Sequence, residues 1–274
     1  MSWLQFWGNI EDNIMPNTLT EKSITNLSEF TAFIEDNINN VLWYRGCNSS
    51  KNNLIPSLYR HKKHNTINQF LDVESKIMNK FKERSTPFLE SPLSNDIENL
   101  FLMQHFGVPT RLLDWTENPF IAMYFALTLI KSNSNTTEDA IIWILNPINW
   151  NQNVLSHRSY KGGVISIYDI EIAGYKPTEV SNSEPIAIYG KYNNRRIVAQ
   201  RGVFTLFGTS TQPMEEIYKL GNFPPDCIIK LIVPSNKIDD MLKSIIRIGF
   251  SDSVVFPDLD GLSKEIKRIF EYEV

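Results

Sequence analysis

Apolar residues recur at helical spacing in the first part of the chain. This spacing predicts an amphipathic helix over 24–38 and a second helix over 67–84. A third helix is expected over about 95–106, with Ser94 as its N-cap and Gly107 at the left-handed position that follows a helix. The first hundred residues are therefore expected to be mainly helical.

Short apolar runs become frequent further along the chain, and these runs predict strands. The clearest is Ala140–Leu145, where AIIWIL is a continuous run typical of a buried strand. Further strands are expected over 41–44, 110–115, 164–168, 185–189, 202–207, 227–233 and 254–256. Later helices are expected over 119–130, 235–248 and 259–271.

The order of these elements indicates the fold class. Helices come first, and strands with interleaved helices follow, which is typical of an α+β fold. We expect a helical N-terminal part packed on a mixed, largely antiparallel β-sheet. No internal repeat or long linker divides the chain, so a single domain is expected over 24–274 after an N-terminal extension, 1–23.

Composition and hydropathy place the chain among globular proteins. Apolar residues make up 42% of the chain and charged residues 21%. The longest apolar candidate, 120–130, is shorter than the roughly 18–20 residues that cross a bilayer. The N-terminus lacks the basic and apolar regions of a secretory signal, and Cys47 and Cys227 are too few for a disulfide framework. We therefore expect a cytoplasmic protein without a membrane partner.

Charge is distributed unevenly along the chain. The net charge of −4 argues against a general nucleic-acid coat. However, residues 41–64 contain five Lys or Arg and no acid, and residues 185–201 contain four Lys or Arg and no acid. If the two stretches meet in the fold, they form one electropositive site; if not, they are two separate solvated surfaces.

Polar side chains are concentrated over 104–118, in the segment QHFGVPTRLLDWTEN. A packing segment would not carry so many, because each unpaired buried polar group costs about 1–3 kcal/mol. Strand alternation places Arg111 on one face, and Asp114 and Thr116 on the other. Asp114 can therefore meet Arg45 or cap the next helix, whose open N-terminus would suit an anion. The alternative is a buried Arg–Asp network that braces the strand-to-helix turn.

Two Arg-Gly pairs lie at predicted strand boundaries. Tyr44-Arg45-Gly46 ends one predicted strand, and Gln200-Arg201-Gly202 precedes another. A guanidinium presents a planar fork of donors to an anion, and glycine removes the Cβ that would block a ligand. The alternative is that each arginine pairs with an internal carboxylate.

Several kinds of functional site have no motif in this chain. No P-loop, dinucleotide-binding glycine motif, zinc-protease motif, nucleophile elbow or CxxC pair occurs. Glu74 is interpreted as part of a solvated helix face, and Asp258 as the cap of the last helix. A carboxylate metal site built from Glu74, Asp114, Asp258 and Asp260 stays conceivable, but their spacing does not enforce one, and we assign no metal ligands.

At these residues the sequence resembles the FRG domain family, which is named for an aromatic-Arg-Gly triplet. The resemblance extends over about residues 24–262, and its most specific part is QHFGVPTRLLDWTENPFIAMYFA at 104–126. The other matching pieces are the triplet at 44–46, LIPSLYR at 54–60, the helix that contains Glu74, NRRIVAQRGVFTLFG at 194–208 and FPDLDGL at 256–262.

A second, more distant resemblance is to ADP-ribosyltransferase folds. Many of these place an Arg-Gly pair at the end of a first strand, then a Ser/Thr-bearing strand before a helix of the form A-x-x-F-A, and later a strand with a catalytic Glu. Arg45, Thr116 and Gln200 follow that order here. The chain departs from the pattern because Gln200 stands where Glu is expected, and a neutral amide cannot stabilise an oxocarbenium ion as a carboxylate can. Asp114 or Glu74 could supply that charge.

This resemblance implies NAD as substrate and an aromatic side chain stacked on the nicotinamide. The candidate catalytic residues are Arg45, Asp114, Thr116 and Gln200. The candidate nucleotide-binding residues are Tyr44, Gly46, Gln104, His105, Arg111, Trp115, Asn118 and Arg201.

Three functions follow as hypotheses. The first is an ADP-ribosyltransferase-like effector of toxin or phage-defence type, which uses NAD and an unidentified protein or nucleic-acid acceptor. The second is a sensor module that binds a nucleotide or nucleic acid without turnover. The third is a metal-dependent nuclease that uses the carboxylates.

Overall fold

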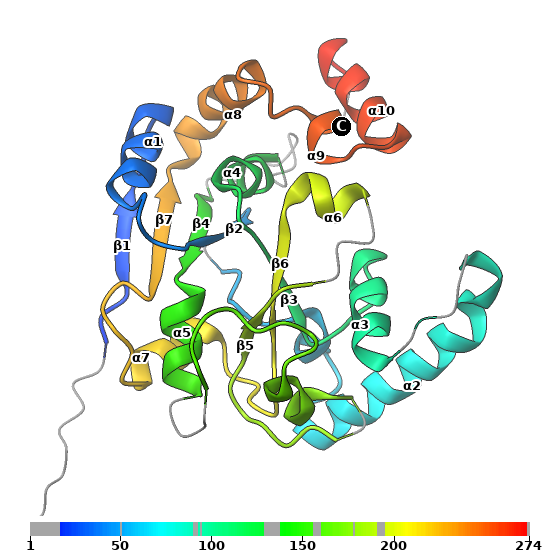
Figure 1. Ribbon diagram of the computed structural model, residues 1–274. Coiled ribbons are helices and arrows are strands. Elements are labelled where there is room, and N and C mark those ends of the chain that lie inside the picture. Colours follow the sequence, from blue (N-terminus) through cyan, green and yellow to red (C-terminus); the bar gives the residue numbers. More distant parts are fainter. Residues whose placement is uncertain are drawn as a thin grey trace, which may run out of the picture.

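The computed structural model describes residues 17–49, 51–89, 93, 95–128, 138–155, 160–177, 179–190 and 195–272. In this part of the chain, seven strands form one twisted sheet in the order β1-β7-β4-β2-β3-β6-β5 (Figure 1). β1 pairs with β7 in parallel, and the other neighbouring strands are antiparallel. This arrangement confirms the α+β class and the mixed, largely antiparallel sheet. The strands are β1 (Thr20–Ser23), β2 (Trp43–Cys47), β3 (Leu112–Thr116), β4 (Ala140–Leu145), β5 (Ile186–Ile188), β6 (Gly202–Leu206) and β7 (Ile228–Val233).

Helices cover both faces of the sheet (Figure 1). They are α1 (Leu27–Asp36), α2 (Ile67–Ser85), α3 (Asp96–His105), α4 (Pro119–Thr128), α5 (Pro147–Val154), α6 (Arg195–Gln200), α7 (Met214–Leu220), α8 (Ile238–Arg247), α9 (Asp252–Val255) and α10 (Leu259–Ile269). Four short 3₁₀ segments complete the described elements, namely η1 (Ser57–Arg60), η2 (Thr86–Phe88), η3 (Ile170–Tyr175) and η4 (Ser235–Lys237).

Strand β4 lies inside the sheet, between β7 and β2, and is buried along its whole length. Its alternate residues face opposite sides, because side chains alternate along a strand. Ile142 and Ile144 join the core formed with α1, α4 and α8, whereas Ile141 and Trp143 join the core formed with α5 and α7. A third core lies between α2, α3 and the β5–β6 edge of the sheet.

Several predicted elements differ from the structure. β2 runs over Trp43–Cys47, so Arg45 lies inside the strand and not after its end. The strand predicted over 164–168 is reduced to a single bridge, because Gly162 and Gly163 adopt positive φ and the segment turns again at Ser166. Residues 254–256 are not a strand, because most of this segment belongs to helix α9.

The start of the sheet and the N-cap of α3 also differ from the prediction. Thr20–Ser23 pairs with β7 and so belongs to the sheet, not to an N-terminal extension. The N-cap of α3 is Asn95. Ser94, the predicted cap, lies outside the described residues, as do residues 1–16 and the end of the helix predicted over 119–130.

A buried ion pair joins α2 to the start of β3. Arg111 is fully buried, and its Nε donates to both carboxylate oxygens of Glu74 at 2.9 and 2.8 Å. The two Nη atoms donate to the backbone carbonyls of Phe207 and Tyr175 at 2.8 and 2.9 Å. Glu74 is therefore not on a solvated helix face. The chain does contain a brace of the kind considered for Arg111, but its acid is Glu74 and not Asp114.

A second close contact places α4 directly on β2. A Cβ on Gly46 would lie 2.0 Å from the carbonyl oxygen of Ala122 and 2.5 Å from the backbone nitrogen of Ala126. These atoms belong to the helix backbone and cannot rotate away. Gly46 therefore permits the close packing of α4 on β2.

We expect Glu74→Ala to destabilise the fold by about 3–5 kcal/mol, because it leaves the Arg111 charge buried without its partner. Urea unfolding of the purified chain measures this loss. Glu83→Ala is the matched control, since Glu83 lies on the same helix in an exposed pair with Lys80, and it should cost less than about 1 kcal/mol. Equal losses in the two variants would contradict the role of the buried pair.

We expect Gly46→Ala to destabilise the fold by about 1–3 kcal/mol, because α4 must move to admit the methyl group. Gly202→Ala is the control, because its Cβ would meet Ile197 Cγ2 at an ordinary 3.5 Å and should change stability by less than about 1 kcal/mol. Thermal unfolding compares the two variants. A Gly46→Ala variant as stable as Gly202→Ala would show that the helix contact does not require glycine.

Candidate functional site

A cleft opens where β2 and β3 part. The two strands pair through a single residue couple, Tyr44 and Thr116, and beyond it the gap is roofed by α4 and the end of α6. Two adjoining cavities of about 220 and 260 Å³ occupy this gap. They share four lining residues, Asp114, Trp115, Phe125 and Gln200.

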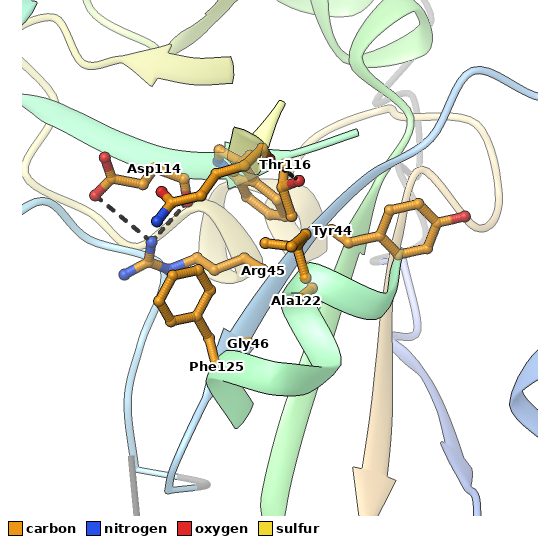
Figure 2. Close-up of a pocket in the computed structure, with 10 residues that line it drawn as sticks. Tyr44, Arg45, Gly46, Asp114, Thr116, Ala122 and Phe125 are labelled. Atoms are coloured by element: carbon orange, nitrogen blue, oxygen red, sulfur yellow. Dashed lines mark hydrogen bonds and ion pairs between the residues drawn. The ribbon is translucent and has the colours of Figure 1, made fainter. Parts of the chain in front are cut away.

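We name the two cavities by the residues that distinguish them. The arginine lobe is also lined by Tyr44, Arg45, Gly46, Thr116, Ile121 and Ala122 (Figure 2). The phenylalanine lobe is also lined by Phe101, Gln104, His105, Gly107, Arg196, Ile197, Gly202, Phe204 and Phe256.

Arg45 and Asp114 meet at the floor of the arginine lobe, as the sequence suggested. Nη1 of Arg45 donates to the backbone carbonyl of Asp114 at 2.6 Å and lies 4.0 Å from Oδ2 of its carboxylate (Figure 2). The Arg45 side chain is 22% exposed, and its Nε has no hydrogen-bond partner among the described residues. The guanidinium is thus fixed at one end and retains an unused donor.

Asp114 is the junction of the two lobes. Its side chain is 54% exposed, and desolvation by the surrounding protein raises its pKa, against the opposing effects of Arg45 and of a hydrogen bond from Gln104. Nε2 of Gln104 donates to Oδ2 at 2.6 Å, and Oε1 of Gln104 accepts from the Thr110 hydroxyl at 2.5 Å. Thr110 thereby fixes the orientation of the amide that holds Asp114. A carboxylate with a perturbed pKa in a cleft is typical of a functional site.

Thr116 and Asn118 tie the neighbouring elements together. The Thr116 hydroxyl donates to the carbonyl of Gln200 at 2.6 Å and accepts from the backbone nitrogen of Asn118 at 2.9 Å. Oδ1 of Asn118 accepts from the backbone nitrogen of Phe120 at 3.0 Å and so caps α4. The N-terminus of α4 is therefore not an open anion site, which corrects that expectation.

The aromatic candidates differ from their expected role. Tyr44 is buried, burial raises its pKa to about 12, and Figure 2 shows its ring directed away from Asp114. Trp115 is also buried, and its Nε1 donates to the Thr205 hydroxyl at 3.1 Å. Phe125, on α4, is the partly exposed aromatic ring that both lobes share. Its segment reads as packing from sequence, so Phe125 was not predicted.

The phenylalanine lobe brings His105 and Arg196 together. Burial and the nearby Arg196 lower the pKa of His105, and Asp258 opposes this effect. The Arg196 guanidinium lies 4.2 Å from the centre of the Phe256 ring, a cation–π arrangement. Asp258 also caps α10 by accepting from the Gly261 backbone nitrogen at 2.8 Å, as predicted.

Of three further predicted site residues, two line neither lobe and the third has its amide nitrogen already bonded. Arg111 belongs to the buried pair with Glu74 and lines neither lobe, so we reassign it from ligand binding to support of the fold. Arg201 is exposed and lines neither lobe, and its carbonyl accepts from the backbone nitrogen of Glu117 at 3.1 Å. Gln200 does line both lobes, but its Nε2 is occupied by the carbonyl of Val255 at 3.1 Å.

The two basic stretches both reach the cleft, and Arg60 of the first stretch also acts on Asp114. Arg45 lines the first lobe and Arg196 lines the second, and the lobes share four wall residues. Lys191 lies outside the described residues. The acids considered for a metal site do not gather, since the described residues contain no group of three or more His, Cys, Asp or Glu placed to hold a metal ion. None of the described helices is long and apolar enough to cross a membrane.

Comparison with known proteins supports one assignment. Neither a curated protein nor a solved structure matches the chain significantly. A family model does match, over residues 40–135, which is a shorter span than the resemblance suggested. The matched segment includes β2, α2, α3, β3 and α4, and therefore Arg45 and Asp114 of the cleft. On this match, residues 40–135 of the chain are an FRG domain.

Proposed function

We propose that the cleft binds NAD and that the protein is an ADP-ribosyltransferase-like enzyme. The observation that carries this proposal is the meeting of Arg45 and Asp114 at the junction of two lobes. A guanidinium beside a carboxylate is suited to a substrate that is anionic at one point and develops positive charge at another. The pyrophosphate of NAD is the anion, and its ribose C1′ is the carbon that becomes positive.

The carboxylate that stabilises this charge is Asp114. Among the residues that line the two lobes it is the one acid. Glu74 is unavailable, because its carboxylate is committed to Arg111. Gln200, at the position where the transferase pattern has Glu, is neutral and its amide nitrogen is already bonded. The carboxylate that the transferase pattern requires is therefore supplied by Asp114 of strand β3 and not by residue 200.

The reaction conserves atoms and charge in a simple way. The bond between C1′ of the ribose and the nicotinamide nitrogen breaks, and nicotinamide leaves as a neutral molecule with the bonding electrons. An acceptor nucleophile forms a bond to C1′ and releases its proton to a base or to water. Asp114, when ionised, stabilises the positive charge on the ribose between these events. Such an activity would suit a toxin or phage-defence effector, because loss of NAD or modification of an acceptor arrests the host cell.

A second candidate is a sensor that binds a nucleotide without turnover. This candidate is favoured because two polar residues beside the cleft, Thr116 and Asn118, are both held by hydrogen bonds to backbone groups. The sensor and the enzyme share the ligand site, and release of nicotinamide separates them.

We expect Arg45→Ala to reduce nicotinamide release from NAD by about a hundredfold or more, because it removes the donor fork at the floor of the cleft. The chain should still unfold cooperatively, since Arg45 is not part of a buried ion pair. Arg247→Ala, at the exposed end of α8, is the control and should keep full activity. Full activity in Arg45→Ala would contradict the assignment, and loss of cooperative folding would make Arg45 a structural brace.

We expect Asp114→Asn to lose activity and to gain stability at neutral pH. Burial raises the pKa of Asp114 in the folded state, so ionisation above the ordinary Asp pKa costs the wild type stability that the neutral Asn does not lose. The stability gain should disappear as the pH falls below that ordinary pKa. Wild-type activity should fall on acidification at a higher pH than an exposed Asp would give.

The control for this variant is Asp258→Asn, because Asn is as good a helix N-cap as Asp. Nicotinamide release and urea unfolding across pH compare the two variants. An Asp258→Asn variant less active than Asp114→Asn would place the chemistry in the C-terminal loop instead.

A further inference from the structure

We propose that the phenylalanine lobe is the acceptor site and that it takes an unpaired base of a single-stranded nucleic acid. This inference rests on the proposed function, because it names the acceptor of the same reaction. The place of Asp114 is the first argument. Its carboxylate lies in the wall that both lobes share, so a ribose held over it has the arginine lobe on one side and the phenylalanine lobe on the other.

The lining of the lobe fits a flat aromatic group. Four phenylalanines line it, and two of them, Phe101 and Phe204, lie with ring centres 4.9 Å apart at its inner side. Phe125 and Phe256 are partly exposed on the same lining, and Arg196 and Lys264 already lie over the Phe256 ring. Phe125 therefore offers the ring on which a base can stack, because every nucleobase has a π-face.

The polar groups of the lobe fit the edge of a base. Gln104 and His105 line it together with the phenylalanines. The Gln104 amide uses one N–H on Asp114 and one lone pair on Thr110, so its second N–H and second lone pair can meet the edge of a base. In the transfer step, a nitrogen of the base attacks C1′ with its lone pair. The proton that this nitrogen carried passes to the imidazole of His105, which lines the lobe, or to water.

The positive charge of Arg196 suits a phosphate group beside the lobe. Arg196 lines the lobe, Asp114 in the shared wall is the acid among its lining residues, and Asp258 acts on His105 from nearby. A phosphodiester on the Arg196 side of the lobe would be attracted. Arg195 and Arg201 are exposed at the two ends of the same short helix, and neither forms an ion pair with another described residue. The segment 195–201 therefore adds positive charge beside the lobe, which a phosphate backbone can meet.

A base can reach the lobe only when it is not paired. The cavity is about 260 Å³, large enough for one base and far too narrow for a duplex, so the base must be unstacked and turned into it. This requirement selects single-stranded nucleic acid over double-stranded nucleic acid as the acceptor.

The test of the site is a binding measurement without NAD. Fluorescence anisotropy monitors how a fluorescein-labelled single-stranded oligonucleotide binds to the full chain. Arg196→Glu and Arg195→Glu, the latter at an exposed residue, should each weaken binding by about tenfold. Arg247→Glu, the matched charge reversal on α8, should leave binding unchanged. An abasic oligonucleotide of the same length should bind more weakly than the intact one, because it offers phosphates without rings.

Transfer of label from NAD tests the acceptor role. The expected result is label on the single-stranded oligonucleotide, little on its duplex and little on polyarginine or polylysine. Label on the polypeptides and none on the oligonucleotide would overturn this inference and leave the proposed function intact. Equal binding of abasic and intact oligonucleotides, or equal binding by Arg196→Glu, Arg195→Glu and Arg247→Glu, would also overturn it. If no acceptor and no water consumes NAD, the proposed function fails and the acceptor role fails with it, whatever the oligonucleotide binding shows.

Discussion

Arg111 carries a full positive charge in a place that water does not reach. Burying a charge is tolerable when an opposite charge and good hydrogen bonds surround it. Glu74 of α2 supplies the charge, and the carbonyls of Phe207 and Tyr175 accept from the remaining nitrogens. Three segments far apart in sequence are therefore held to the residue just before β3. Asp114 lies three residues further along that strand, so the pair that fixes the strand also fixes the candidate catalytic carboxylate.

The cleft itself results from two strands that separate. β2 and β3 are joined through Tyr44 and Thr116, and Arg45 spans the gap beyond that couple by donating to the carbonyl of Asp114. Helix α4 can roof this gap because Gly46 lets its backbone approach β2 closely. The aromatic-Arg-Gly triplet thus combines two tasks in adjacent residues. Its arginine enters the cleft, and its glycine brings the helix that closes one side of it.

The electrostatics of the cleft separate two kinds of polar residue. Those that satisfy backbone groups, such as Thr116 and Asn118, stabilise the junction of β3 with α4 and α6. Two others are placed differently: Arg45 keeps an unpartnered Nε, and desolvation raises the pKa of Asp114. An unused donor beside a carboxylate with a perturbed pKa, in a cleft, is typical of a functional site. Gln200 alone would suggest an inactive site, whereas the charge that we propose for the reaction lies on another strand, at Asp114.

The sequence by itself determined the elements whose signals are local. The periodicity of α2, the apolar run of β4 and the glycine after α3 each depend on neighbouring residues, so they could be predicted. The concentration of polar side chains over 104–118 is also visible in the sequence. The sequence predicts that Asp114 can meet Arg45, because strand alternation depends on neighbouring residues alone. Short helices such as α6 give too few turns for a periodic signal and were not predicted.

Only the tertiary structure decided how distant residues pair. Glu74 falls on the buried stripe of α2 between Phe70 and Met78, a four-residue spacing that the sequence contains, but its partner depends on the order of strands. The packing of α4 on Gly46 and the partial exposure of Phe125 likewise depend on how α4 lies on the sheet. The sequence pattern indicates which face of a helix or strand is apolar. The partner of a charged residue on that face depends on which element packs against it in the tertiary structure.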